Sequence, residues 1–359
     1  MHAMTPSLPL HPDDLHARWL EDALAGRHPG TRVAELEVIA VHEVTNPHVR
    51  VAVEYEGRSD LPRSLFVKMV PRDPTRREQI ARTGMGRREV RFYEDLAPHL
   101  ALRVPRVFAT GLDDDDESFV IVMEDLVDGG CTVSDGTVGV TPDAAARALA
   151  ELADLHVRYE DPARRAAEAP WAPRAVHGSP YGVNLLGEAL AGHRDRMSVD
   201  FAALAELYVE RCDELQALWH VGPQTVIHGD PHIGNLFDDH GRTGFLDWGI
   251  VNVSTPMRDV GYFLTMAMET EDRRTHERDL LRHYLDARAG HGGTPLSFDD
   301  AWTAHRRHAA YTVPACCQIV TYPAGISERR RVFSEAFLAR AEAAVADLDA
   351  LAAVRAAGL

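Results

Sequence analysis

The chain has 359 residues, of which 45% are hydrophobic and 26% are charged, and its formal net charge is −17 at pH 7. These fractions are typical of an ordinary folded protein, and the length allows about two domains with packed cores. The negative charge argues against a nucleic-acid partner, which needs a basic surface, and the absence of a long apolar run argues against a membrane span.

Cysteine usage and the first residues favour an intracellular protein. The four cysteines show no C-x-x-C spacing, and the adjacent pair Cys316-Cys317 is unsuited to a structural disulfide. Residues 1–10 lack the charged segment followed by an apolar one that marks a signal peptide. We therefore expect a cytoplasmic protein with reduced thiols and no membrane partner. These patterns carry no prediction of the oligomeric state.

Residues 1–126 have the pattern of a small antiparallel sheet with helices. Strands are expected where valine-rich runs are broken by turn residues. These runs cover residues 36–44, 49–55, 64–70 and 119–123. Helices are expected over residues 13–25 and 87–100, where apolar residues recur at helical spacing. Gly129-Gly130 then suits a flexible connection to the rest of the chain.

Lys68 lies in the third expected strand and is the only lysine in the chain, where every other Lys or Arg position is arginine. A compact ammonium on a flexible stem can reach between two phosphates where a planar guanidinium would not fit. The sequence therefore predicts that Lys68 binds the phosphates of a nucleotide. The alternative is a surface lysine placed there by chance.

A buried lysine of this kind needs a carboxylate to hold it. Glu89 falls on the apolar face of the helix expected over residues 87–100, whereas Glu94 points away from that face. Glu89 is therefore the candidate partner of Lys68. The alternative is an ordinary amphipathic helix with Glu89 at its rim.

From residue 127 onward the sequence predicts mainly helices. Their signals cover residues 141–157, 199–219, 256–268, 272–289, 297–319 and 327–354. Prolines and glycines interrupt residues 162–186, which are expected to form either a plain connector or a loop over a cleft. Val226-Ile227 and residues 243–246 are expected to be two short strands of a hairpin-like unit, with a turn at 239–241.

Polar residues suited to catalysis gather after the first of these short strands, in the sequence H-G-D-P-H-I-G-N at 228–235, and Asp247-Trp248 follows soon after. An aspartate, an amide five positions later and a second carboxylate twelve positions beyond match the needs of phosphoryl transfer: one base for a hydroxyl and two oxygen ligands for magnesium. Alternatively, His228, Asp230 and His232 could bind zinc in a hydrolase. That interpretation leaves Asn235 and Asp247 without a role.

The pattern H-G-D-x-H-x-x-N followed by D-W resembles the aminoglycoside phosphotransferase and choline kinase-like family of small-molecule kinases. With Glu124-Asp125-Leu126 upstream, the chain looks most similar to the ecdysteroid kinase-like branch. The resemblance implies a catalytic base at Asp230 and magnesium ligands at Asn235 and Asp247. A protein kinase is not expected, because its loop has arginine where this chain has Gly229 and no A-P-E follows.

The resemblance also implies a nucleotide-binding hinge. Backbone groups of Glu124 and Leu126 would pair with the edge of adenine, and Met123 would lie behind it. The turn between the first two strands, at 45–48, reads T-N-P-H, where many kinases have glycines. Phosphates would meet a bulkier loop there, so the sequence leaves open whether ATP or GTP is bound.

We therefore expect an α+β protein with a protein-kinase-like, two-lobe fold. Residues 1–126 would form the nucleotide-binding lobe with its small antiparallel sheet, and residues 127–359 the mainly helical lobe with the catalytic loop and the acceptor pocket. The expected reaction moves the γ-phosphate of ATP, with Mg²⁺, to a hydroxyl of a small molecule. A catalytically silent nucleotide-binding scaffold and, less favoured, a metal-dependent hydrolase are the alternatives.

The acceptor is expected to be a neutral or anionic hydroxylated molecule, such as a metabolite, natural product or sterol-like alcohol. A polycationic aminoglycoside would need a cluster of carboxylates, whereas arginines nearly balance Asp and Glu over residues 256–359. Four aromatic residues are candidates to line the acceptor pocket, although such residues more often belong to a core. They are Tyr262, Trp302, Tyr311 and Tyr322.

Overall fold

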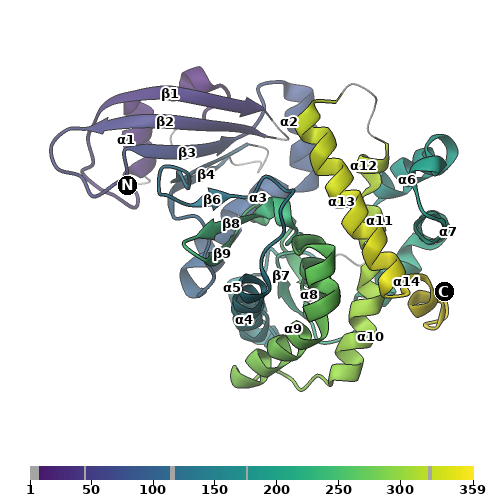
Figure 1. Cartoon of the computed structure of the whole chain (residues 1–359). Coiled ribbons are helices and arrows are strands. Elements are labelled where there is room, and N and C mark those ends of the chain that lie inside the picture. Colours follow the sequence, from purple (N-terminus) through teal and green to yellow (C-terminus); the bar gives the residue numbers. More distant parts are fainter. Residues whose placement is uncertain (1–7, 44–45, 114–117, 175–176, 322–325) are drawn as a thin grey trace. The chain divides into compact units, whose positions relative to one another are not determined.

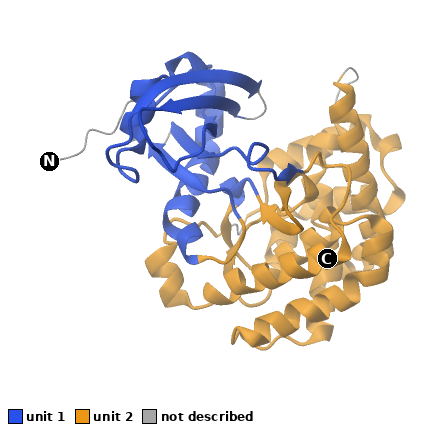
Figure 2. Cartoon of the chain, turned by 60° about the vertical axis from the view of Figure 1, so that its left-hand side comes forward, with its two compact units in different colours: residues 1–99, 104–133, 246–250 blue, residues 100–103, 134–245, 251–359 orange. Residues whose placement is uncertain are grey.

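The computed structural model describes residues 8–43, 46–113, 118–174, 177–321 and 326–359 (Figure 1). These residues form two compact units, drawn in blue and orange in Figure 2. Unit 1 comprises Met1–His99, Val104–Val133 and Leu246–Ile250, and unit 2 comprises Leu100–Arg103, Ser134–Phe245 and Val251–Leu359. The short segment that carries Asp247 therefore belongs to unit 1, although it follows the chain of unit 2.

Unit 1 is built on a five-stranded antiparallel sheet with the strand order β1-β2-β3-β5-β4. The strands are β1 (Val33–Glu43), β2 (Pro47–Tyr55), β3 (Ser64–Met69), β4 (Val107–Leu112) and β5 (Phe119–Glu124). Alternate residues of β2, namely Val49, Val51 and Val53, are buried, as expected for a strand with one face in a core. They belong to the same core as Trp19 and Leu20 of α1 (Ala17–Leu24).

The predicted helix over residues 87–100 consists of three pieces. These are α3 (Met85–Arg91), a π-helical turn (Phe92–Leu96) and a 3-10 turn (Ala97–His99). The ring of Phe92 stacks on Trp248, with centroids 3.7 Å apart, and Arg88 donates to the carbonyl of Gly249 at 2.8 Å. These contacts attach the helix to the segment that carries Asp247. The remaining elements of unit 1 are 3-10 turns at Pro12–Asp14 and Trp248–Ile250, α2 (Pro74–Thr83) and β6 (Thr132–Val133).

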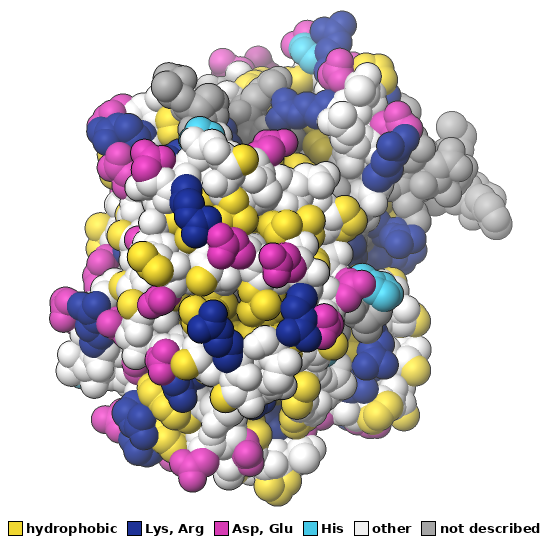
Figure 3. All heavy atoms as spheres, turned by 90° about the vertical axis from the view of Figure 1, so that its right-hand side faces the viewer, with side chains coloured by type: hydrophobic (Ala, Val, Ile, Leu, Met, Phe, Trp, Pro, Cys, Tyr) yellow, Lys and Arg dark blue, Asp and Glu magenta, His cyan; other side chains and the backbone are white. Residues whose placement is uncertain are grey.

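Unit 2 is mainly helical, as predicted. Its helices are α4 (Pro142–Arg158), α5 (Pro162–Glu168), α6 (Pro180–Gly192), α7 (Val199–Trp219), α8 (Pro256–Ala267), α9 (Thr270–Gly290), α10 (Phe298–Ala309), α11 (Thr312–Ala315), α12 (Cys317–Val320), α13 (Glu328–Asp347) and α14 (Ala350–Arg355), with 3-10 turns at Arg194–Arg196 and Ile233–Asn235. None of the helices in the described ranges is both long and apolar enough to cross a bilayer. On the face drawn in Figure 3, acidic and basic side chains are interspersed.

The short strands of unit 2 pair differently from the prediction. β7 (Thr225–Ile227) pairs with β10 (Asn252–Ser254), and β8 (Leu236–Asp239) pairs with β9 (Arg242–Phe245). The two strands predicted to form one hairpin-like unit thus belong to separate pairs. The reason is the two-residue turn after β8, where His240 and Gly241 have φ angles of 53° and 88° and allow a tight hairpin.

Helix boundaries differ from the prediction within residues 162–186 and within each of the last two predicted helices. Residues 162–186, expected to be irregular, contain α5 and much of α6, because Pro162 and Pro180 stand in the first turn behind capping Asp161 and Ser179. The last two predicted helices are each interrupted. One break lies at Asp349, whose φ of 49° ends α13 before α14 begins.

Two helical glycines test the packing of the two units with the same substitution. A Cβ on Gly86 of α3 would lie 2.2 Å from the ring of Phe119, whereas a Cβ on Gly187 of α6 would meet no atom within 4 Å. Gly86→Ala should therefore lower the free energy of unfolding by about 1–3 kcal/mol. Gly187→Ala should raise it by about 0.5–1 kcal/mol, because alanine is the better helix former. Thermal and urea unfolding of both variants check the opposite signs, and two shifts of the same sign would contradict the packing around Gly86.

Candidate active site

Three charged side chains meet in unit 1. The ammonium of Lys68 on β3 lies 2.6 Å from Glu89 Oε2 on α3 and 3.2 Å from Asp247 Oδ1. Lys68 and Glu89 are buried, with 6% and 3% of their surface exposed, whereas the Asp247 side chain remains 43% exposed. The structure thus brings together three of the residues singled out in the sequence.

Burial and neighbouring charges act in opposite directions on the pKa values of this cluster. Burial alone would lower the pKa of Lys68, but the carboxylates of Asp247 and Glu89 raise it, so the ammonium stays charged. Burial raises the pKa of Glu89 to about 7, and the Lys68 charge opposes that shift. Both carboxylates lie beside the one ammonium, and the Asp247 side chain, at 43% exposure, is accessible to a second cation.

Asp247 is held in an unusual backbone conformation. It comes two residues after β9 and has a φ of 57°, in the left-handed region that few residues other than glycine adopt. The stacked Trp248 and the bonded carbonyl of Gly249 fix the chain just after it. Strained residues that the fold holds in this way are concentrated at functional sites.

His48 lies next to Lys68 in the sheet, because the two residues are paired across β2 and β3. Burial and the charge of Lys68 lower the pKa of His48 to about 4, so its ring is neutral at pH 7. In the glycine-poor turn, Asn46 is buried and Thr45 lies outside the described residues. A neutral ring and a buried amide thus occupy the described part of this turn.

The predicted hinge follows β5. Met123 is buried, and Glu124 exchanges bonds with Arg106: its N–H donates to the Arg106 carbonyl at 2.9 Å and its carboxylate accepts from the Arg106 N–H at 2.8 Å. Asp125 is fixed by Arg50 at 2.6 Å and Ser64 at 2.6 Å.

Leu126 is the last residue of the predicted hinge, and one of its two backbone groups is hydrogen-bonded within the described ranges. Its carbonyl accepts from the Cys131 N–H at 2.8 Å. Within the described ranges, its own N–H has no acceptor. This N–H can therefore donate to a ligand.

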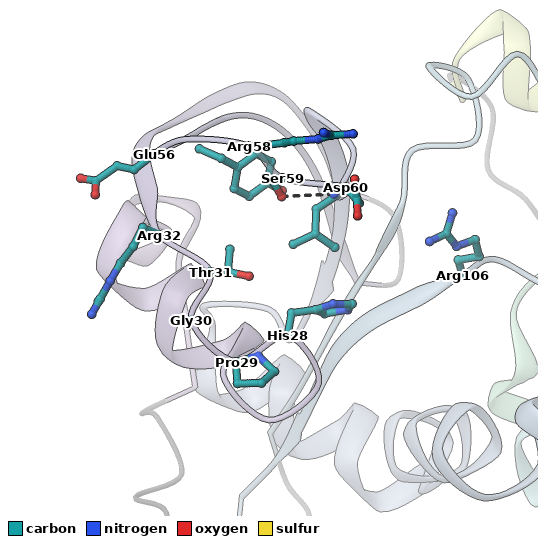
Figure 4. A pocket seen from close by; sticks show the side chains of 12 residues that line it. His28, Pro29, Gly30, Thr31, Arg32, Glu56, Arg58, Ser59, Asp60 and Arg106 are labelled. Carbon is teal, nitrogen blue, oxygen red and sulfur yellow. Dashed lines mark hydrogen bonds between the residues drawn. The ribbon is translucent and has the colours of Figure 1, made fainter.

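A cleft of about 390 Å³ lies elsewhere in unit 1, at the end of β2 opposite to His48 (Figure 4). Its lining carries both signs of charge, with Arg58 and Arg106 beside Glu56 and Asp60. This mixture selects no class of ligand. None of the residues predicted to bind nucleotide lines the cleft.

In unit 2, a buried carboxylate holds the loop that carries Asp230. Asp259, in the first turn of α8, is fully buried and accepts from the N–H groups of His228 at 2.7 Å and Gly229 at 2.8 Å. His156 on α4 lies 3.2 Å from the same carboxylate, and its other ring nitrogen lies 2.9 Å from the Tyr284 hydroxyl. Because a carboxylate only accepts, the His156 nitrogen facing Asp259 carries the proton.

Asp259 stays ionised at this buried position. Burial alone would raise its pKa, but the bond from His156, the charges of both histidines and the Gly229 N–H lower the pKa below its ordinary value. His156 is therefore part of the support of the loop.

Asp230 and Asn235 face each other within that loop. The Asn235 Nδ2 donates to the Asp230 carbonyl at 3.0 Å and to Asp230 Oδ2 at 3.1 Å. Because its nitrogen is engaged, the oxygen of Asn235 is the atom left to bind a cation. His232 accepts from the Gly234 N–H at 2.9 Å, and its other ring nitrogen lies 3.5 Å from Asp230 Oδ2.

Aromatic side chains surround this loop. The ring of Tyr262 on α8 packs on His232 and on Tyr311, and burial and the adjacent Asp230 carboxylate raise the pKa of its hydroxyl. Phe337 on α13 also meets His232, at 5.0 Å between centroids. Of the predicted aromatic residues, Tyr262 thus lies next to Asp230, and Tyr311 packs on Tyr262. Trp302 instead packs with Phe298 and His305, and Tyr322 lies outside the described residues.

The donor sets of the two units fit the groups that the sequence pattern implies. Asp247 and Asn235 offer a carboxylate and an amide oxygen, which are ligands that magnesium prefers. Lys68 offers a compact cation for phosphates, and Leu126 a backbone donor for a base. His228 is fully buried, and its Nδ1 accepts from the Asp230 N–H at 3.2 Å, so it is engaged within the loop.

Comparison with known proteins decides the class of enzyme. The sequence profile of the phosphotransferase enzyme family matches residues 50–295, which is more than half of the chain. The chain belongs to this phosphotransferase family. No curated protein sequence matches the chain significantly. The match rules out the hydrolase alternative, and the predicted class of enzyme, a small-molecule kinase, is confirmed.

Solved structures show the fold of this phosphotransferase. A candidate aminoglycoside phosphotransferase from Ralstonia eutropha JMP134 is 14% identical with a TM-score of 0.54, and the alignment covers 93% of this chain and 97% of that one. A GDP complex of an aminoglycoside 2′-phosphotransferase of type IIIa is 13% identical with a TM-score of 0.51, covering 93% and 99%. The predicted α+β, protein-kinase-like fold is confirmed. The finer likeness to the ecdysteroid kinase-like branch stays a prediction.

Several residues of the phosphotransferase site were not identified from the sequence. The partners of Asp125, namely Arg50 and Ser64, are 75 and 61 positions away, and no local pattern joins them. His48 was noted only as part of a glycine-poor turn, although its position opposite Lys68 follows once the strands are paired. Pairing the predicted strands in register would have found it.

The support of the catalytic loop can be tested at Asp259. Asp259→Asn should destabilise unit 2 by about 2–4 kcal/mol, because an amide leaves a buried N–H of the loop without its acceptor. Asp279→Asn is the matched control, since that carboxylate is 81% exposed and pairs only with Arg282. Thermal unfolding of both variants checks the difference. Equal midpoints for the two variants would contradict the supporting role of Asp259.

Proposed function

We propose that this phosphotransferase moves the γ-phosphoryl group of ATP to a hydroxyl group of a small molecule, with Asp230 as the base. The observation that carries the proposal is the geometry of Asp230 and Asn235. The amide of Asn235 donates to Oδ2 of the Asp230 carboxylate and so orients it, and a carboxylate can accept a further proton. The side chain is one quarter exposed and is therefore accessible to an acceptor.

The residues of unit 1 would bind the nucleotide. Lys68 would hold the phosphates, and Glu89 would keep its ammonium charged and directed into the site. Adenine would lie at Met123, with the Leu126 N–H and a backbone group of Glu124 at its edge. We retain residues 1–126 as the nucleotide-binding lobe and residues 127–359 as the acceptor lobe.

Asp247 and Asn235 would hold the metal ion. The proposal is supported by the exposed carboxylate of Asp247 and by the oxygen of Asn235 that is left when its nitrogen binds Asp230. When bound, magnesium would offset the negative charge that develops on the phosphate oxygens during transfer. Asp230 would meanwhile orient the acceptor hydroxyl and remove its proton.

The acceptor is proposed to be neutral or anionic. Tyr262 and Phe337 give the surroundings of the Asp230 loop an apolar character, which suits a molecule with an apolar body. The protein is proposed to act in the cytoplasm.

An acceptor-dependent release of ADP from ATP tests this function. Purified protein is screened against a library of hydroxyl compounds that includes kanamycin- and streptomycin-type antibiotics, with GTP as a parallel phosphate donor. Release above the acceptor-free rate supports the proposal. If Mg²⁺-ATP binds but no compound stimulates ADP release, a silent scaffold is favoured. A specificity constant above about 10⁴ M⁻¹s⁻¹ for an aminoglycoside would refute the proposed acceptor class.

The proposed role of Asp230 predicts that its substitution lowers turnover without weakening nucleotide binding. Asp230→Ala should lower kcat by at least about 10²-fold, because the proton acceptor is lost, while the affinity for Mg²⁺-ATP stays within a few-fold. Asp286→Asn, at an exposed position of α9, is the control. Steady-state kinetics and ATP titration measure both quantities. Unchanged turnover in the Asp230 variant would remove it as the base.

The proposed role of Lys68 predicts how its substitutions rank by activity. Lys68→Arg should be nearly as inactive as Lys68→Ala, because the planar guanidinium cannot take the place of the ammonium between Glu89 and Asp247, which lie 2.6 and 3.2 Å away. The kcat/KM of both variants is compared with that of the wild type. Near-normal activity of the arginine variant would show that charge alone suffices.

A further inference from the structure

The sheet of unit 1 has one face in the core and one face that is partly open. Alternate residues of β2 belong to the core around α1, whereas His48 and Arg50, which point to the other face, are partly exposed. The open face continues on β3, where Lys68 is paired with His48 and Phe66 with Arg50. The Phe66 ring is also partly exposed, and its centroid lies 5.2 Å from that of His48. A ligand can therefore reach the sheet beside Lys68.

His48 differs from the other histidines of the candidate site in its hydrogen bonding. His156, His228 and His232 each have a ring nitrogen bonded within unit 2. The ring nitrogens of His48 have no hydrogen-bond partner among the residues that the structure describes. Burial and the charge of Lys68 lower the pKa of His48 to about 4, so the ring is neutral at pH 7 and one nitrogen carries a hydrogen. This N–H is available to an acceptor on a ligand.

Lys68 by itself offers few hydrogen-bond donors to the phosphates of a nucleotide. Its ammonium has three N–H groups, and two of them are directed to Glu89 and Asp247. The turn before β2 adds little, because Pro47 has no N–H. From residue 48 onward, the backbone of β2 is paired with β1 on one side and with β3 on the other (Figure 1). Further donors for the phosphates must therefore come mainly from side chains of the open face.

His48 is better placed for this purpose than its neighbour on β2. The guanidinium of Arg50 is held by Asp125 through Nε at 2.7 Å and Nη2 at 2.6 Å, and it belongs to the next row of the sheet. His48 instead lies directly opposite Lys68. The Cβ atoms of such a pair are about 4.5–5.5 Å apart and point to the same face. Both side chains can therefore contact one group of phosphates.

We propose that the His48 ring donates a hydrogen bond to a phosphate oxygen of the bound nucleotide, beside the contact from Lys68. This inference rests on the proposed phosphate-binding role of Lys68. A side chain of β2 would take over the task that a glycine-rich turn over the phosphates performs in many kinases. Since the strand is held by two neighbours, the position of this donor does not depend on the conformation of the turn. The contact recognises the phosphates and not the base or the ribose.

The test compares the binding of ATP and of adenosine to variants of His48. His48→Phe keeps a ring that can pack on Phe66 but has no N–H donor, whereas His48→Gln keeps a donor. Both affinities are measured by calorimetric titration in the presence of Mg²⁺. His48→Phe should weaken ATP binding by about 10- to 100-fold, as expected for the loss of a hydrogen bond to a charged group, and leave adenosine binding within about two-fold. His48→Gln should bind ATP within a few-fold of the wild type.

His42 provides the matched control. It is exposed on β1 and is paired with His48 on the side away from Lys68. His42→Phe makes the same change on the same face of the sheet, one strand further from Lys68, and should leave both affinities unchanged. The thermal midpoints of the His42 and His48 variants are measured without nucleotide. A purely structural role of His48 would lower its midpoint and weaken ATP and adenosine binding by the same factor.

The outcomes separate this inference from the proposed function. If Lys68→Ala weakens ATP binding and His48→Phe does not, the inference is overturned and the role of Lys68 stands. An equal loss for ATP and adenosine in His48→Phe overturns it as well. If the loss is selective for ATP but no compound stimulates ADP release, the phosphate contact stands and the proposed transfer fails. If the wild type binds ATP no more tightly than adenosine, the phosphate-binding roles of both residues are wrong. Should His48→Phe not fold, His48→Leu serves in its place with the same expected loss.

Discussion

The fully buried carboxylate of Asp259 fixes the loop on which the chemistry of unit 2 depends. It accepts two consecutive backbone N–H groups, from His228 and Gly229, directly before Asp230. The bond from His156 keeps this carboxylate ionised, and the Tyr284 hydroxyl fixes the orientation of the histidine. Three helices, α4, α8 and α9, therefore determine the position of a loop that has little regular structure of its own. The precision of the loop comes from the packing of these helices.

In unit 1 the buried ion is a cation, the ammonium of Lys68. Lys68 stays charged at 6% exposure because the carboxylates of Asp247 and Glu89 lie beside it. The helix α3 brings Glu89 to Lys68, because Gly86 allows the helix to pack closely on Phe119 of β5. In both units, a buried ion is compensated by groups far away in the sequence.

This dependence on distant partners explains what the sequence could and could not predict. The spacing of Asp230, Asn235 and Asp247, the single lysine and the helical face of Glu89 are local features, and they led to the correct fold and class of enzyme. The pairing of β7 with β10 joins segments far apart in the sequence and was missed. The helices α5 and α6 were missed for a different reason: Pro162 and Pro180 were interpreted as breaks, although a proline behind a capping side chain starts a helix.

The nature of the acceptor shows the limit of counting charges. Over residues 256–359 arginines nearly balance carboxylates, and this balance favoured a neutral or anionic molecule. The structure shows that the regional total is a poor measure, because most of these arginines are used within the fold, as Arg273 is by Glu277 and Asp347. What remains for a ligand is the charge that the fold leaves uncompensated.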